Sequence, residues 1–223
     1  SALREIATRE TGLGDALADG VDAAGRRYGG EDLVPTVKAM ELPAYDPRGA
    51  ESMALAYATS DRGACHRRAR PVEREVFDGR WSPERAARAV VDEQNQRSVL
   101  WCLVVDDFVG DVFEDLGAAW LDAVGLDTEG DLETVGERVW TLTRLFNVRD
   151  GVSRADDELP SPLREPPDGP GEGIDPERFE AMLDAYYELR GWGPDGLPTR
   201  ETVERLDLAD AVGSDLSTLT TRP

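Results

Sequence analysis

One histidine is the group in this sequence best suited to move protons. His66 is the only histidine and follows Cys65 in the run RGACH, residues 62–66. Imidazole titrates near neutral pH, which suits it to general acid–base chemistry. A Cys-His pair can also be a fragment of a metal site, although two ligands do not close a zinc site. Taken alone, the pattern fits a packed or surface histidine better than either chemistry.

Two other stretches carry side chains that could contact a ligand. Asp46, Arg48 and Gly49 lie in the run DPRG, where a backbone turn and a guanidinium could meet an anion. Asp106 begins a pair of aspartates after the apolar run LWCLVV, residues 100–105. By themselves these are a common turn sequence and a solvated pair at a helix end. No phosphate-binding glycine loop and no serine-hydrolase elbow accompanies them.

The composition is that of an acidic chain able to bury a core. Its 223 residues suffice for one large domain or two small ones. Asp and Glu number 46 against 25 Lys and Arg, so the formal net charge is −21, and Lys38 is the only lysine. We interpret the surface as adapted to multimolar salt, where screening removes self-repulsion, with an ordinary acidic protein as the alternative. Such a surface makes nucleic acid a poor partner.

The sequence also indicates a compartment. It has no apolar run of about 18 residues, which excludes a membrane span. The first ten residues, SALREIATRE, lack the apolar segment of a secretory signal, so we expect a cytoplasmic protein. Cys65 and Cys102 are then expected to be free thiols.

Helical signals dominate the elements that must position these residues. Ser82 followed by Pro83 is typical of a helix start and predicts a helix to about Val99. The apolar run after it could be helix or buried strand. Residues 132–146 predict an amphipathic helix whose apolar stripe is Leu132, Val135, Val139, Leu142 and Phe146. Asp175 and Pro176 open another capped helix, after a loop at residues 150–173 that is rich in proline and glycine. The fold class is therefore mainly α, with two packed helical subdomains as one arrangement.

Four stretches, in chain order, resemble blocks of the tungsten-dependent aldehyde ferredoxin oxidoreductases. They are VKAMELPAYDPR at 37–48, LAYATSDRGACH at 55–66, LFNVRDGVSRADDELP at 145–160 and AYYELRGWGPDGLPTRETVERLDL at 185–208. The similarity covers nearly the whole chain, but only the later half of a family member. It implies the family's helical C-terminal domains, with residues 1–108 lining the pterin–metal site and residues 109–223 forming a second helical subdomain.

The resemblance implies an oxidoreductase. Family members hold tungsten or molybdenum through two pterin cofactors beside a four-iron four-sulfur cluster. They oxidise aldehydes to carboxylic acids and pass the electrons to ferredoxin. In a complete protein, His66 would carry protons, while Asp46, Arg48 and Gly49 would help form the cofactor pocket. Three cluster cysteines and the first domain lie upstream in the family and are absent from these 223 residues.

Those absences set expectations for the chain by itself. We expect it to bind neither cofactor alone and to be inactive without its implied partner, the missing N-terminal portion. A homodimer is one arrangement that the sequence leaves open.

Two positions that matter in the family are substituted. Within RSVLWCLVVDDF, residues 97–108, the resemblance puts Trp101 at the pterin-binding aspartate and Asp106 at the fourth cluster cysteine. An indole N–H only donates, so Trp101 cannot accept a pterin N–H, whereas a carboxylate can replace one thiolate at an iron. An alternative alignment that moves Cys102 to the ligand position would leave the following phenylalanine unmatched. The substitutions keep a second hypothesis open, a paralogue without metal cofactor that serves as a structural or binding subunit.

Overall fold

The structure is a computed structural model that describes residues 1–106, 117–126, 132–168 and 171–212. Its regular structure is almost entirely helical, and the one sheet among these residues is a two-stranded hairpin. The prediction of a mainly α fold is confirmed. Within the described part of the chain, no helix combines the length and apolar character that crossing a bilayer requires.

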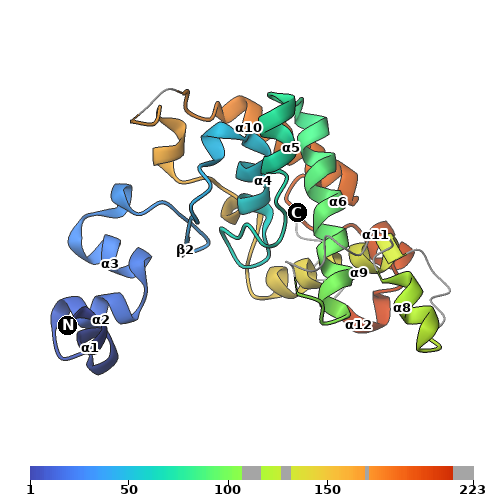
Figure 1. Cartoon of the computed structure of the whole chain (residues 1–223), viewed down its shortest axis with the longest axis horizontal. Coiled ribbons are helices and arrows are strands. Elements are labelled where there is room, and N and C mark those ends of the chain that lie inside the picture. Colours follow the sequence, from blue (N-terminus) through green and yellow to red (C-terminus); the bar gives the residue numbers. More distant parts are fainter. Residues whose placement is uncertain (107–116, 127–131, 169–170, 213–223) are drawn as a thin grey trace.

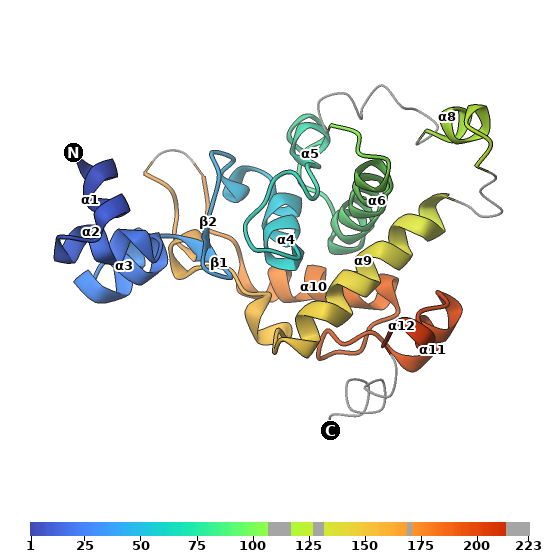
Figure 2. The same cartoon turned by 90° about the horizontal axis from the view of Figure 1, so that it is seen from below.

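Four helices form the centre of the fold: α4 (Glu51–Thr59), α6 (Pro83–Cys102), α9 (Leu132–Arg149) and α10 (Pro176–Arg190). α6 packs against both α9 and α10, and α4 closes the arrangement beside α6 (Figures 1 and 2). The largest apolar cluster lies between them and includes Val90, Trp140 and Tyr186. Every residue of α4 is buried, as expected of a helix whose sequence is largely apolar on all sides.

The predicted helix start at Ser82 is confirmed in α6. The Ser82 hydroxyl accepts a hydrogen bond from the Arg85 backbone N–H at 3.3 Å, and Pro83 occupies the first helical position. The helix continues to Cys102, slightly beyond the predicted end. The apolar run after Val99 therefore begins as the last turn of a helix, and not as a strand.

The helix predicted at residues 132–146 is α9, but its predicted apolar stripe is wrong as the buried face. Leu142 and Phe146 are 41% and 54% exposed. The residues that α9 buries are Gly136, Trp140, Thr141, Arg144, Leu145 and Val148. Gly136 lets α9 approach α6 so closely that a Cβ there would lie 2.1 Å from the Asn95 carbonyl oxygen. Apolar periodicity missed this face because it includes a glycine, a threonine and an arginine whose charge is paired inside the core.

Loops and short helices make up the rest of the described chain. The described part of the predicted loop at 150–173 contains two 3₁₀ turns, η3 (Arg154–Asp156) and η4 (Ser161–Arg164), and no α-helix. Asp175 then caps α10 by accepting from the Glu177 N–H at 3.0 Å, as predicted. The described residues also form α5 (Val72–Asp78), α8 (Ala118–Ala123), α11 (Arg200–Arg205) and α12 (Ala209–Val212). The predicted subdomain boundary between residues 108 and 109 lies outside the described residues and stays a prediction.

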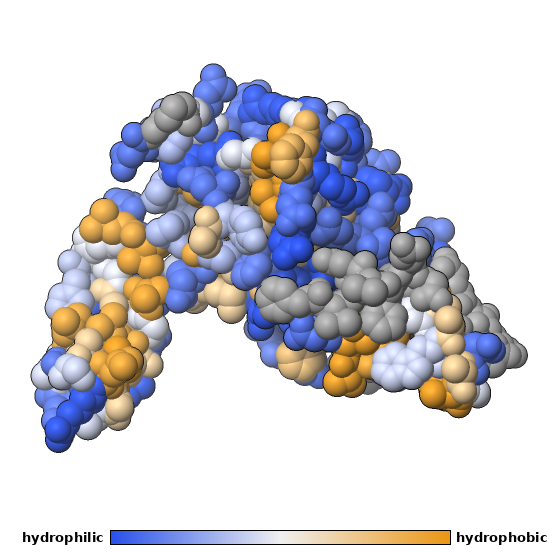
Figure 3. Space-filling model, in the orientation of Figure 1, coloured by the Kyte–Doolittle hydropathy of each residue, from blue (hydrophilic) through white to orange (hydrophobic). Residues whose placement is uncertain are grey.

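The first three helices form an arm that stands away from the centre (Figures 1 and 2). They are α1 (Ala2–Thr8), α2 (Gly12–Ala18) and α3 (Val21–Tyr28), and none contributes to the apolar clusters of the described residues. Leu3 and Leu13 are exposed, and apolar surface gathers over the arm in Figure 3. The turn η1 (Glu31–Leu33) and the hairpin of β1 (Thr36–Val37) and β2 (Met40–Glu41) join the arm to the centre.

Candidate functional site

The segment that carries His66 joins α4 to α5 (Val72–Asp78) and has no regular structure. Asn147 on α9 fixes its start by donating to the Asp61 carbonyl oxygen at 2.6 Å. His66 is half-buried, and its ring lies against Tyr45 with centroids 5.5 Å apart. Because Tyr45 directly precedes Asp46, the structure brings the RGACH and DPRG runs together.

The DPRG turn is held by its own charges. The Asp46 carboxylate accepts from the Arg48 backbone N–H at 3.0 Å and from its guanidinium at 2.7 Å. The guanidinium bond holds the pKa of Asp46 below its ordinary value. Arg48 also donates to the Glu165 carbonyl oxygen at 3.0 Å, which ties the turn to the loop after η4. Gly49 is exposed, and no atom lies within 4 Å of where its Cβ would be, so this edge of the turn is open.

Trp101 lies in the last turn of α6 and is half-buried. The Arg68 guanidinium lies over its ring, 4.0 Å from the centroid. Arg68 is itself held by Asp61 through two hydrogen bonds of 2.6 and 3.0 Å. The His66 segment is thereby fastened to the end of α6 by a cation–π contact of about 0.5–2 kcal/mol.

Contacts link most of the predicted site residues to one another. His66, the DPRG residues and Trp101 are linked through Tyr45 and Arg68. Asp106 is exposed and lies beyond the end of α6. Cys65 is buried with its sulfur 3.0 Å from an Arg62 nitrogen, while Cys102 is exposed; both are free thiols, as predicted.

The sequence analysis did not predict a buried ion cluster that lies near the His66 segment. Lys38 Nζ lies 2.7 Å from Asp157 Oδ1, and these side chains are only 10% and 1% exposed. Arg144 pairs with the second Asp157 oxygen at 2.9 Å, and the Tyr187 hydroxyl donates to the same carboxylate. Burial lowers the pKa of Lys38, although Asp157 opposes that shift. The available signal was Lys38 itself, the one lysine in a chain that otherwise uses arginine.

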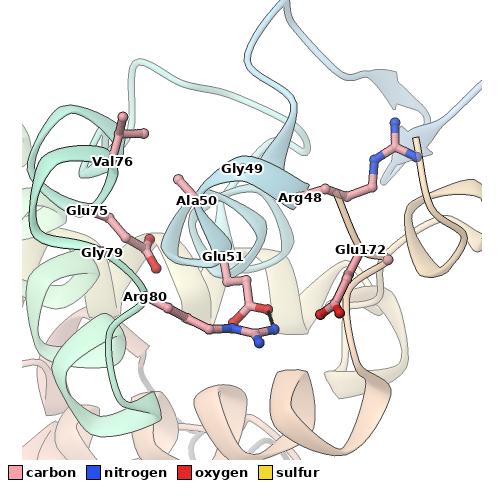
Figure 4. A pocket seen from close by; sticks show the side chains of 10 residues that line it. Arg48, Gly49, Ala50, Glu51, Glu75, Val76, Gly79, Arg80 and Glu172 are labelled. Atoms are coloured by element: carbon pink, nitrogen blue, oxygen red, sulfur yellow. Dashed lines mark hydrogen bonds and ion pairs between the residues drawn. The ribbon is translucent and has the colours of Figure 1, made fainter. Parts of the chain in front are cut away.

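A pocket of about 250 Å³ opens beside the DPRG turn at the start of α4 (Figure 4). Several of its charged groups already have partners within the chain. Glu51 forms ion pairs with Arg80 and Arg178, and Glu75 accepts from the Ser52 N–H at 2.8 Å. Figure 4 shows Arg80 and Glu51 pointing toward each other. The α4 N-terminus is therefore already capped by Glu75, so it does not offer that N–H to an outside anion.

Comparison with known proteins decides the family. The family model for aldehyde ferredoxin oxidoreductase, domains 2 and 3, matches residues 1–208. The chain belongs to this family. The tungsten-containing aldehyde ferredoxin oxidoreductases of Pyrococcus furiosus and Thermococcus kodakarensis are 39% and 37% identical to it. Each alignment covers 93% of this chain and 36% of the relative, so the chain spans little more than a third of their length.

One solved structure has a fold similar to that of this chain. It is the active site complex BamBC of benzoyl coenzyme A reductase in complex with 1,5-dienoyl-CoA. The TM-score is 0.73, and the match covers 97% of this chain and 39% of that chain at 22% identity. The likeness confirms the predicted helical C-terminal fold of the family.

Trp101 does not fit the pterin contact that the resemblance assigns to its position. Trp101 offers a single donor N–H and no acceptor. Its ring also lies beneath the Arg68 cation. A pterin edge that presents N–H donors needs a hydrogen-bond acceptor, and neither the indole nor the Arg68 guanidinium can supply one. Among the described residues, no three His, Cys, Asp or Glu side chains are grouped so that they could hold a metal ion.

Proposed function

We propose that this chain is the C-terminal portion of an enzyme that oxidises aldehydes to carboxylic acids and passes the electrons to ferredoxin. The complete protein would carry tungsten or molybdenum on pterins and an iron–sulfur cluster. Membership of the family and 39% identity to a tungsten-containing enzyme support this proposal. The observation on which it rests most is the packing of the His66 segment against the DPRG turn through Tyr45.

His66 is the proposed catalytic residue of this portion. Conversion of a hydrated aldehyde to a carboxylate releases protons, and an imidazole beside the reacting carbon can accept one near neutral pH. Its half-buried position against Tyr45 orients the ring and leaves part of it accessible. Asp46, Arg48 and Gly49 are proposed to wall the cofactor pocket, and Asp106 to stand at the cluster-ligand position.

The experiment is the His66→Gln substitution in the complete protein, purified without oxygen. Turnover of acetaldehyde should fall by roughly 10²- to 10⁴-fold while the metal content stays unchanged. Glu73→Gln is the matched control, because Glu73 is an exposed acid on α5 and should not affect turnover. Unchanged turnover in His66→Gln would remove His66 from the mechanism.

A second candidate function is favoured by the Arg68–Trp101 contact. A paralogue that keeps the fold, binds no metal cofactor and serves as a structural or binding subunit would tolerate an indole at this position. Elemental analysis of the complete protein separates the two. Tungsten or molybdenum with about four irons per chain supports the enzyme. Absence of all three metals supports the paralogue.

The proposed setting is a salt-rich cytoplasm. It is supported by the net charge of −21 and by the scarcity of lysine. Ferredoxin is the proposed electron acceptor, nucleic acid is not an expected partner of so acidic a chain, and the homodimer stays a prediction.

A further inference from the structure

The hairpin between the arm and α4 turns through two residues that are not glycine. Val37 pairs with Met40, so Lys38 and Ala39 form the turn, with φ of 48° and 62°. Tight hairpin turns with positive φ at both positions favour asparagine and glycine, because a Cβ crowds the backbone there. A turn of this kind persists only where its surroundings hold it in place.

The Lys38 side chain supplies that support. Its ammonium is ion-paired with Asp157 at 2.7 Å and donates to the carbonyl oxygen of Ala58 in the last turn of α4. A cation at the C-terminal end of a helix also meets the negative end of the helix dipole. Arg144 and Tyr187 fix the Asp157 carboxylate from α9 and α10. The turn is thus anchored to the centre of the fold.

The use of lysine at this position is itself informative. Among 25 basic residues, Lys38 is the only one that is not arginine. An ammonium is compact and can direct its donors toward a carboxylate and a carbonyl at once, whereas a guanidinium is planar and larger. Lysine, and not arginine, therefore stands where one cation must reach both the Asp157 carboxylate and the Ala58 carbonyl oxygen inside the core.

The His66 segment rests directly on this hairpin. Gly63 approaches it so closely that a Cβ would lie 2.4 Å from the Val37 carbonyl oxygen and 2.9 Å from Met40 Cβ. Val37 and Ala64 are buried in one small apolar cluster with Tyr57. The hairpin therefore forms the support beneath residues 63 and 64.

The same small cluster also fixes the residue beside His66. The Tyr57 hydroxyl donates to the Tyr45 carbonyl oxygen at 3.0 Å, and Tyr45 is the residue whose ring contacts His66. A movement of the hairpin would therefore change both the backbone before His66 and the ring beside it.

We propose that Lys38 is a positioning residue for His66: its anchor on Asp157 and Ala58 holds the left-handed hairpin turn against Gly63 and so sets the place of the imidazole. This deepens the proposed function, because it assigns a second residue to the same site. Without the anchor, the turn can relax toward negative φ, and the His66 segment loses the surface against which it packs.

The test uses the fact that His66 is the only histidine of the chain. In proton NMR its imidazole gives one pair of C–H signals and one titration curve, and it needs no cofactor. We expect Lys38→Met and Lys38→Arg to shift these signals and to move the titration midpoint by about half a pH unit or more. Arg27→Met is the matched control: it removes a positive charge on the arm, where Arg27 pairs with Asp15, and should leave both unchanged.

Lys38→Arg keeps the buried charge, so it tests positioning even if Lys38→Met does not fold. Adding Ala39→Gly to Lys38→Met, which favours the turn without the anchor, should bring the His66 signals back toward those of the parent chain. Unchanged His66 signals in Lys38→Arg, or equal shifts in Arg27→Met, would overturn the proposal.

The complete enzyme separates this inference from the proposed function. Lys38→Arg should lower kcat and shift its pH profile, with little change in KM. If His66→Gln leaves turnover intact while the Lys38 variants move the His66 signals, the proton-carrying role fails and the positioning stands. If His66→Gln abolishes turnover while those signals do not move, the function stands and the positioning fails.

Discussion

Replacing Asp157 by asparagine should destabilise the folded chain by about 3–5 kcal/mol. Asp157 is 1% exposed and is the acidic partner of both Lys38 and Arg144. Asparagine keeps the volume and one carbonyl oxygen, but it leaves two cations in the core without a counter-charge. Removal of one partner from a buried pair costs more than the pair contributed, because the desolvation of the remaining charge is no longer offset.

The buried cluster should make this loss of stability smaller at high pH. Burial already lowers the pKa of Lys38, and the Asp157 charge opposes that shift. Without the Asp157 charge in the Asp157→Asn variant, the Lys38 pKa should fall further, so the ammonium can lose its proton in the folded state at a lower pH. The destabilisation by Asp157→Asn should therefore be smaller at pH 9 than at pH 6, because only the Arg144 charge then stays unpaired.

Urea unfolding followed by the fluorescence of the five tryptophans measures this difference, in buffers of equal and high potassium chloride concentration. For a chain of this length, the expected loss corresponds to a fall in Tm of roughly 6–20 °C. Asp150→Asn is the matched control. Asp150 is exposed and pairs loosely with Arg149 at 3.7 Å, so its change should stay within about 0.5 kcal/mol. A loss below about 1 kcal/mol for Asp157→Asn would refute the account of an unscreened buried cluster.

Three further predictions concern the surface, the acid response and the arm. Stability should rise steeply between low and molar potassium chloride, since salt screens the net charge of −21; a flat Tm would contradict the salt-adapted surface. Burial opposes ionisation of Glu51, but hydrogen bonds from Arg80 and Arg178 outweigh it and hold its pKa below 4.5. Its contribution to stability should be complete above about pH 4.5 and be lost below it, so Glu51→Gln should flatten the acid limb of stability against pH; an unchanged limb would exclude this cause. In the isolated chain, amide hydrogen exchange should be fastest in α1–α3, which share no apolar cluster with the centre; protection equal to that of α6 would contradict this.

The sequence predicted those elements whose determinants are local. Ser82 and Pro83 specify the start of α6 through one cap and one fixed φ, and Asp175 does the same for α10. The resemblance pointed to the RGACH and DPRG runs as candidate site residues, and the structure adds that the ring of Tyr45 contacts His66. In each case the information lies within a few residues or within a recognisable block.

What the sequence could not predict depends on pairs far apart in the chain. The buried face of α9 is set by Arg144, which is hidden only because Asp157 folds back onto it, and by the close approach of Gly136 to Asn95. Hydropathy assigns an arginine to the surface and a leucine to the core, so it placed the buried face on the opposite side of α9. The turn at Lys38 carried no glycine or asparagine to mark it, since its support comes from the core and not from its own sequence.

The surface and the core of this chain therefore follow different electrostatic rules. On the surface, many acids and arginines lie in water, where salt screens them and each pair contributes little. In the core, the charges of Lys38, Asp157 and Arg144 are shielded from salt by the helices around them, so their positions are fixed by geometry and not by ionic strength. Salt can then stabilise the fold without altering the support beneath His66. The position of His66 should therefore stay the same across a range of ionic strength, because the contacts that support it are buried away from salt.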